Sequence, residues 1–468
     1  MTTQKKAKTQ AKSPTSPKTS ENTGRWKVLI YMAADNNLKE ESLFALTEIL
    51  RAGPVPGMDI TAQLDSGINL TRYDFSLLKS NLNARLDDLK VPISSNFPLM
   101  TDSERLREFL TYTPDKPVEY DHTMLILSGH GSGAVGDFLP SLNPPAALSI
   151  PDLRKILVSD GNKIDILGMD SCLMSMAEVC YELRDNVTYL VGSEGFARNA
   201  GWPYFQIITS LRDNPVTDPK DVACRIVQEY IQYYSDYTDI GISVDQSACD
   251  LSKSDQLKVK VKELAKQLQD NLSSIKDTIV LAHWEAQSYK ADQYVDLWDF
   301  CDCLSKRCKT TDSNIQKACQ GVKDAVEQMV LVSCASGPVV QFSQGLSLYF
   351  PWNLFTFSPQ YWNLQFATDT GWESFLRDYV NATCREPRKD CDGASLQTLP
   401  LDPVSQSGTP ATPLGFRYSD ANRYSDANRF LENAIGTMKN FTNKFYKPVN
   451  CCKSQPSLPS AVEMTGVK

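Results

Sequence analysis

The fold of this chain is decided by two similar stretches, TMLILSGHG at residues 123–131 and KIDILGMDSC at residues 163–172. Each begins with a short, nearly continuous apolar run, which is typical of a strand covered by helices on both faces. A helical pattern at residues 150–159 separates the two runs, and a third apolar run at residues 188–193 follows another helical pattern. Strands that alternate with helices in this way indicate a parallel α/β sheet with right-handed crossovers.

The same alternation extends towards the N-terminus. Residues 26–32 form an apolar run of strand length, residues 58–65 alternate like a strand, and residues 101–110 carry a helical pattern. We therefore expect a doubly wound, mostly parallel sheet sandwiched by helices, as one catalytic α/β domain over residues 25–215. Ligands bind such sheets beyond the carboxyl ends of the strands, so the residues that follow the apolar runs are the first candidates for chemistry.

Outside this region the composition changes. Residues 216–381 are mainly helical in pattern, with short strand-like runs at residues 240–244 and 345–350, and we expect a helix-rich C-terminal subdomain there. Residues 1–24 have almost nothing apolar to bury, and residues 382–468 are rich in Pro, Ser, Thr and Asn. We expect a disordered tail at the first end and a low-complexity tail at the second.

The overall composition excludes several classes of protein. Of the 468 residues, 41% are hydrophobic and 22% charged, as in ordinary globular proteins. The net charge of −8 gives no electrostatic footprint for nucleic acid or an anionic membrane, and no apolar run approaches membrane-spanning length. Thirteen cysteines, an odd number, and no apolar leader near the N-terminus favour a reducing compartment. We therefore expect a cytoplasmic protein, by preference a monomer, that binds neither nucleic acid nor membrane.

His130 is one of only three histidines in the chain. It directly follows the first apolar run, between Gly129 and Gly131, which let the backbone turn sharply and expose the imidazole at the end of the strand. A histidine in this place is a candidate general base. On this segment alone, an ordinary glycine-rich strand exit explains it equally well.

Cys172 follows the second apolar run, where we expect a helix over residues 173–184. A helix N-terminus carries partial positive charge that would stabilise a thiolate. If the two strands are neighbours, Cys172 and His130 meet at one edge of the sheet as a nucleophile and its acid/base, which cysteine-mediated acyl transfer requires. We expect most other cysteines, such as Cys180, to be small buried hydrophobes.

Taken together, these motifs resemble those of the clostripain-like cysteine peptidases, relatives of the caspase and legumain fold. The matching pieces, in the family's order, are His130-Gly131, MDSCLM at 169–174, GSE at 192–194, GWPY at 201–204, Asp296-Leu297 and GLSLYFP at 345–351. The resemblance implies a caspase-like fold and a cysteine endopeptidase that acts on proteins or peptides. It also implies that the chemistry requires no cofactor.

The resemblance further implies roles for individual residues. Cys172 attacks the scissile carbonyl, His130 acts as acid and base without a third residue, and the N–H groups of Gly131 and Cys172 form the oxyanion hole. Asp170 would pair with an Arg or Lys side chain just before the cleaved bond. Alternatively, Asp170 caps the helix expected after Cys172. Glu194, at the end of the next strand, is a second acidic candidate for substrate binding, unless it is simply solvated.

Two features depart from the family pattern. Relatives often carry an acid just before the Gly-Trp pair, where this chain has Ala200, with Arg198 nearby, so part of the attraction for a basic substrate is missing. Many relatives also mature by cutting after a basic residue in the loop that follows the histidine. Residues 131–153 contain neither Lys nor Arg. We therefore predict activity as an uncut chain, or control by another protease.

Other classes of function stay open at this point. The chain can be a catalytically silent caspase-like module that binds or regulates a partner. It can also be a metal or redox protein that uses Cys301, Cys303 and Cys308 or the pair Cys451-Cys452, although none of these has zinc-ribbon spacing. Some clostripain-like enzymes depend on calcium, and the acidic loop at residues 115–121 is a candidate for binding it, although no EF-hand pattern is present.

Overall fold

The computed structural model describes residues 24–67, 69–78, 84–93, 100–112, 118–143, 145–159, 161, 163–238, 241–290, 293–309, 312–352 and 356–383. The tails predicted at residues 1–24 and 382–468 lie almost entirely outside the described residues.

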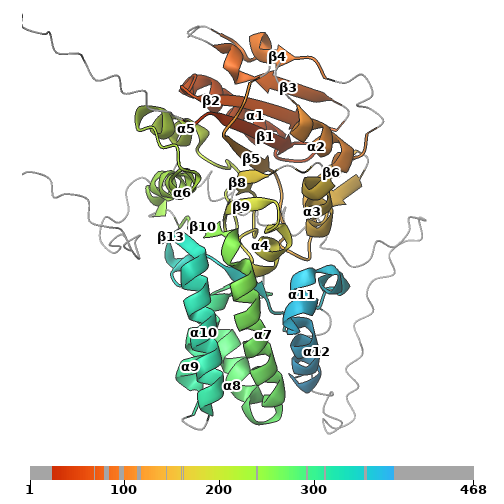
Figure 1. The fold of residues 1–468 in the computed structure, drawn as a ribbon, viewed down its shortest axis with the longest axis vertical. Helices are drawn as coiled ribbons and strands as arrows, with labels where there is room; N and C mark the ends of the chain where they lie inside the picture. The colour runs from red at the N-terminus through yellow and green to blue at the C-terminus, as the bar shows by residue number, and fades with distance from the viewer. Residues whose placement is uncertain are drawn as a thin grey trace, which may run out of the picture.

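A nine-stranded sheet crosses the upper part of the molecule (Figure 1). Its strands, in order across the sheet, are β13 (Val330–Ser336), β10 (Val244–Asp250), β9 (Val187–Gly192), β8 (Ile164–Asp170), β5 (His122–Ser128), β1 (Trp26–Ala33), β2 (Met58–Asp65), β3 (Leu70–Asp74) and β4 (Lys90–Val91). The central strands from β9 to β2 run parallel, and antiparallel strands flank them on both sides. The predicted class, a doubly wound α/β sheet with a parallel centre, is confirmed.

Helices cover both faces of this sheet (Figure 1). One layer contains α1 (Lys39–Ala52), α5 (Tyr204–Asp213) and α6 (Pro219–Ser235), and the other contains α2 (Asp102–Thr111), α3 (Ile150–Ser159) and α4 (Ala177–Leu183). Alternate side chains of each central strand enter opposite cores. In β5, Met124 and Ile126 pack into the first core, while Leu125 and Leu127 pack into the second. This two-sided burial explains why the strand reads as a continuous apolar run.

The C-terminal part is rich in helices, as predicted. Its helices are α7 (Ser254–Asp270), α8 (Leu272–Glu285), α9 (Leu297–Arg307), α10 (Ser313–Met329), α11 (Gln365–Thr370) and α12 (Trp372–Thr383). Figure 1 shows α7 to α10 gathered as a bundle below the sheet. A small sheet contains β11 (Ser288–Tyr289), β12 (Tyr294–Asp296) and β14 (Ser347–Tyr349), and β6 (Phe138–Leu142) pairs with β7 (Pro145–Leu148). Short 3-10 turns are η1 (Phe75–Leu78), η2 (Leu86–Leu89), η5 (Leu251–Lys253), η7 (Pro338–Val340) and η8 (Pro359–Asn363).

Strand β13 was not predicted, because it lies within the mainly helical pattern of residues 216–381 and outside the two strand-like runs expected there. Helix α10 ends at Met329 and the chain continues at once as a strand. The β-branched residues Val330 and Val332 favour this change. Since β10 and β13 join the central sheet, that sheet takes strands from both sides of the boundary predicted at residue 215. Among the described helices, none is both long and apolar enough to cross a membrane.

Candidate active site

The carboxyl ends of β5 and β8 bring the two predicted catalytic residues together. These strands are parallel neighbours, and their last residues, Ser128 and Asp170, are paired in register. His130 and Cys172 each follow two positions later, so they leave the sheet at the same edge. A Cβ on Gly131 would lie 2.5 Å from the carbonyl oxygen of Cys172, which shows how closely the two loops approach.

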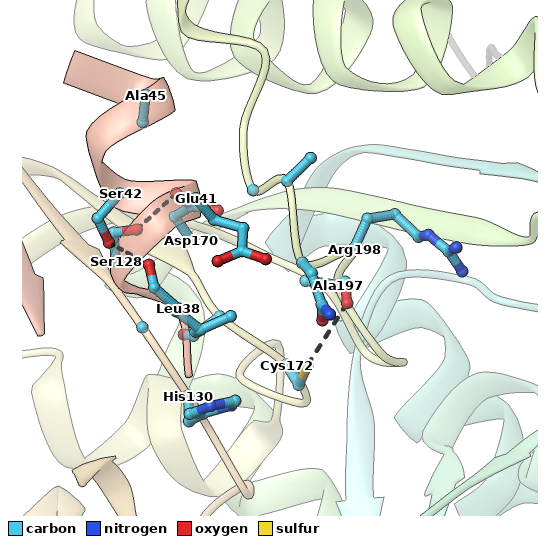
Figure 2. A pocket seen from close by; sticks show the side chains of 15 residues that line it. Leu38, Glu41, Ser42, Ala45, Ser128, His130, Asp170, Cys172, Ala197 and Arg198 are labelled. Carbon is cyan, nitrogen blue, oxygen red and sulfur yellow. Dashed lines mark hydrogen bonds between the residues drawn. The ribbon is translucent and has the colours of Figure 1, made fainter. Parts of the chain in front are cut away.

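His130 and Cys172 line one pocket (Figure 2). Its other lining residues come from the start of α1, from the ends of β5 and β8, and from the loop after β9. They are Leu38, Glu41, Ser42, Ala45, Ser128, Gly129, Asp170, Ser171, Ala197, Arg198, Asn199, Ala200 and Gly201. Figure 2 shows the His130 ring and the Cys172 side chain bordering the same side of this pocket.

The His130 ring is held by Asn37, a residue between β1 and α1. Nε2 of His130 lies 2.7 Å from Oδ1 of Asn37. Because an amide oxygen only accepts, Nε2 carries the hydrogen in this pair, and Nδ1 of a neutral ring is left to accept a proton. Burial lowers the pKa of His130 from 6.5 to about 4, so the ring is neutral at neutral pH.

Sequence reasoning missed Asn37. A signal for it existed, because the polar residues 35–37 follow a third apolar strand, β1, which is the parallel neighbour of β5. The end of β1 therefore belongs to the same sheet edge as His130. Contacts between this loop and the histidine depend on strand order, which the sequence pattern does not determine.

The Cys172 thiol is protonated in this arrangement. Sγ donates to the carbonyl oxygen of Ala197 at 3.7 Å. Burial raises the pKa of Cys172 to about 11, and the negative charges of Asp170 and Asp245 add to this. The helix predicted over residues 173–184 exists as α4, but its predicted start at residue 173 is wrong, because α4 begins only at Ala177. No helix N-terminus therefore lies at the thiol to stabilise its thiolate.

The loop that carries Cys172 is held in a strained conformation. Leu173, the next residue, has a φ of 65°, which is costly for a side chain other than glycine. Its N–H donates to the carbonyl of Gly195 at 2.9 Å, and the N–H of Ser175 donates to that of Ser193 at 2.9 Å. These bonds tie the loop to the segment after β9 and hold Cys172 in place.

Asp170 is a buried carboxylate with three donors from the protein. Oδ1 accepts from the N–H of Trp202 at 3.0 Å, and Oδ2 accepts from the hydroxyls of Ser128 and Tyr204, each at 2.9 Å. Burial raises its pKa from 3.8 to about 6. Asp170 ends β8, and α4 begins only at Ala177, so the alternative reading as a helix cap is wrong. Asp170 lines the pocket with His130 and Cys172.

Glu194 is not brought to this pocket, and it is not solvated either. Its side chain is fully buried, and Oε2 accepts from the N–H of Gly345 at 2.7 Å. Burial, together with the charges of Asp296 and Asp245, raises its pKa well above the usual range. Strand β9 pairs with β10, and the N–H of Glu194 donates to Oδ2 of Asp245 in that strand.

The metal alternative gains no support from the part of the chain that the structure describes. Among the described residues, no group of three or more His, Cys, Asp or Glu side chains is arranged to hold a metal ion. Cys301 is buried, whereas Cys303 and Cys308 are partly exposed, and all three are free thiols. The pair Cys451-Cys452 and part of the acidic loop at residues 115–121 lie outside the described residues, so calcium binding stays a prediction.

Comparisons with known proteins point to one family. The sequence model of the clostripain family, the C11 peptidases, matches residues 30–379. The chain is 23% identical over 392 residues to clostripain from Hathewaya histolytica. The aligned region covers 69% of this chain and 74% of that protein.

Solved structures of C11 proteases share the fold. A secreted C11 cysteine protease from Bacteroides thetaiotaomicron, in complex with an irreversible peptide inhibitor, has a TM-score of 0.55 and 18% sequence identity. An inactive zymogen of a C11 protease from Parabacteroides distasonis has a TM-score of 0.56 and 19% identity. Each match covers 75% of this chain and 99% of the other. The expected caspase-like architecture is therefore confirmed.

These comparisons correct the expected location. We expected a cytoplasmic protein, but the matched Bacteroides thetaiotaomicron protease is described as secreted, and the cytoplasmic expectation is wrong. The cysteine count misled because a chain with two large apolar cores folds without disulfides, so free thiols do not report the compartment.

Proposed function

Because the chain belongs to the clostripain family of cysteine peptidases, we propose that it hydrolyses peptide bonds with His130 and Cys172 as its catalytic dyad. The family establishes a cysteine endopeptidase that acts on proteins or peptides. The observation that carries the residue assignment is the register of β5 and β8, which puts both residues two positions beyond one paired strand end. The pocket that both residues line supports the same assignment.

The two shifted pKa values suggest how the proton moves. At rest, the thiol and the imidazole are both neutral, since the pKa of Cys172 is raised to about 11 and that of His130 is lowered to about 4. His130 then takes the thiol proton as Sγ attacks the carbonyl carbon, and gives it to the departing amine when the peptide C–N bond breaks. A water molecule, deprotonated by His130, hydrolyses the resulting thioester and frees Cys172.

The N–H groups of Gly131 and Cys172 are the proposed donors to the oxyanion. The 2.5 Å separation between a Cβ at residue 131 and the Cys172 carbonyl supports this, because only glycine allows the two backbones to approach so closely. Donors held in this way by backbone need no rearrangement as negative charge develops on the carbonyl oxygen.

Cleavage after Arg or Lys, with Asp170 attracting the basic side chain, is the proposed specificity. Oδ1 of Asp170 has one protein donor, so it keeps acceptor capacity for a guanidinium or ammonium group. Ala200, which contributes no charge, and Arg198 line the same pocket. The negative charge that selects a basic residue must therefore come from the side of the pocket formed by Asp170 and α1.

A set of peptides that differ only in the residue before the cut tests this function. Wild type should cleave the Arg and Lys peptides, and Cys172→Ala and His130→Ala should each lose at least about 10³-fold in kcat. No cleavage of any peptide, with calcium or reductant added, would favour the silent binding module. Cleavage without preference for Arg or Lys would contradict the proposed specificity but not the proposed peptidase activity.

A further inference from the structure

Glu41 reaches the pocket from the first turn of α1. Leu38, Glu41, Ser42 and Ala45 all line the pocket, and their spacing places them on one face of the helix. Figure 2 shows the Glu41 side chain extending towards the loop at Ala197, on the pocket side opposite His130. The preceding residue, Glu40, is exposed and does not line the pocket.

One carboxylate oxygen of Glu41 lacks a donor. Oε2 is shielded from solvent and accepts no hydrogen bond from the described residues. Leaving a buried acceptor without a donor is unfavourable, and such groups are rare unless a ligand or water completes them. Asp170 differs, because both of its oxygens already accept from the protein. Of the two pocket acids, Glu41 is therefore the one with a buried oxygen that has no protein donor.

The surroundings of Glu41 favour a cationic ligand. Figure 2 shows the Arg198 side chain extending away from Glu41, and Ala200 adds no charge to the pocket. Glu41 and Asp170 are its two lining carboxylates. A guanidinium or ammonium group that enters the pocket would meet the unpaired oxygen and form a charge-assisted hydrogen bond.

We infer that Glu41 is a specificity-determining residue that accepts a hydrogen bond from the basic side chain just before the cleaved bond. This inference rests on the proposed cleavage after Arg or Lys. Asp170 contributes negative charge to the pocket. Glu41, on helix α1, accepts the hydrogen bond from the basic side chain and compensates for the missing acid at position 200.

The test compares Glu41→Gln with Glu40→Gln on three peptides that carry Arg, Lys or Leu before the cut. Both variants remove one negative charge from the first turn of α1, so they are matched for net charge and for the helix dipole. We expect Glu41→Gln to lower kcat/KM for the Arg and Lys peptides by about 10- to 100-fold, mainly through KM. The Leu peptide and the Glu40→Gln variant should change by less than about threefold.

A double variant gives a readout that misfolding cannot imitate. Ala200→Asp adds a carboxylate from the loop after β9, so in the Glu41→Gln background it should restore most of the preference for Arg and Lys. Equal losses on all three peptides in Glu41→Gln, or an unchanged Arg-to-Leu ratio, would overturn the role of Glu41. A wild-type enzyme without any basic preference would instead overturn the proposed specificity, and the role of Glu41 with it.

Discussion

Ser128 and Asp170 end the neighbouring strands β5 and β8, and the hydroxyl of Ser128 donates to Oδ2 of Asp170 at 2.9 Å. This bond joins the two strand ends directly beneath the loops that carry His130 and Cys172. The same register that pairs these residues therefore sets the position of the proposed dyad. It also explains why Asp170 is buried near Cys172, where burial of the thiol and, after it, the charge of Asp170 raise the pKa of Cys172.

Asn37→Ala should slow catalysis without unfolding the protein. The change removes the oxygen that accepts from Nε2–H of His130, so the ring loses this restraint on its orientation and tautomer. We expect kcat to fall about 10- to 100-fold with little change in KM, as for other groups that orient a catalytic residue. Because Asn37 is exposed, the melting temperature should stay within a few degrees of wild type. An unchanged kcat would show that Asn37 does not orient the ring.

The preference for basic residues should weaken as the pH falls through about 6. Burial raises the pKa of Asp170 from 3.8 to about 6, so this carboxyl is charged above pH 6 and neutral below it. We expect the ratio of kcat/KM for Arg and Leu peptides to fall up to about tenfold between pH 7.5 and 5. For the Leu peptide alone, kcat/KM should decline only as the pH approaches 4, where His130 becomes protonated.

Asp170→Asn is the control for this pH dependence. The step near pH 6 in the Arg-to-Leu ratio should disappear in this variant, whereas the decline near pH 4 should remain. The stability of the wild type should also fall as the pH rises through about 6, because the folded state binds the Asp170 proton more tightly than the unfolded chain does. A step near pH 6 that persists in Asp170→Asn would assign it to another group.

Gly131→Ala should abolish activity. The new Cβ would lie 2.5 Å from the Cys172 carbonyl and 3.1 Å from Sδ of Met174, so the nucleophile loop must move. A shift of this size should lower kcat at least about 100-fold. Gly161→Ala is a useful comparison, since its φ is +63° but no atom lies within 4 Å of its Cβ. Both variants should lose stability in a thermal melt, but only Gly131→Ala should lose activity; near-normal turnover by Gly131→Ala would contradict the close approach of the two loops.

The enzyme should be active without cutting itself in the loop after His130. Residues 131–153 contain no Lys or Arg, and the next basic residues, Arg154 and Lys155, lie within α3. Nε of Arg154 also lies 3.7 Å from Oε2 of the buried Glu182. Cleavage after Arg154 would therefore require α3 to unfold locally. Mass spectrometry of purified active protein should find this region intact. Fragments split between residues 131 and 163 in wild type, but absent in Cys172→Ala, would show self-cleavage.

Much of the architecture was predictable because it depends on hydrophobic patterns over a few consecutive residues. The apolar run before Ser128 and the run ending at Met169 identified strands buried on both faces, since the hydrophobic period reports burial directly. His130 and Cys172 could be proposed for the same reason, since each lies within three residues of the end of such a run. The start of α4 and the existence of β13 were not, because tertiary packing overrides weak local preferences at the ends of elements.

The sequence by itself predicted that the chemistry lies at strand ends and named His130 and Cys172 as the residues proposed to supply it. Only the tertiary structure decided the neighbours of those residues. Asn37 and Glu41 reach the site because β1 lies beside β5, whereas Glu194 is buried because β9 packs against β10. Hydrophobic periodicity is a property of a few consecutive residues, but strand order and register depend on contacts between segments that are far apart in the chain.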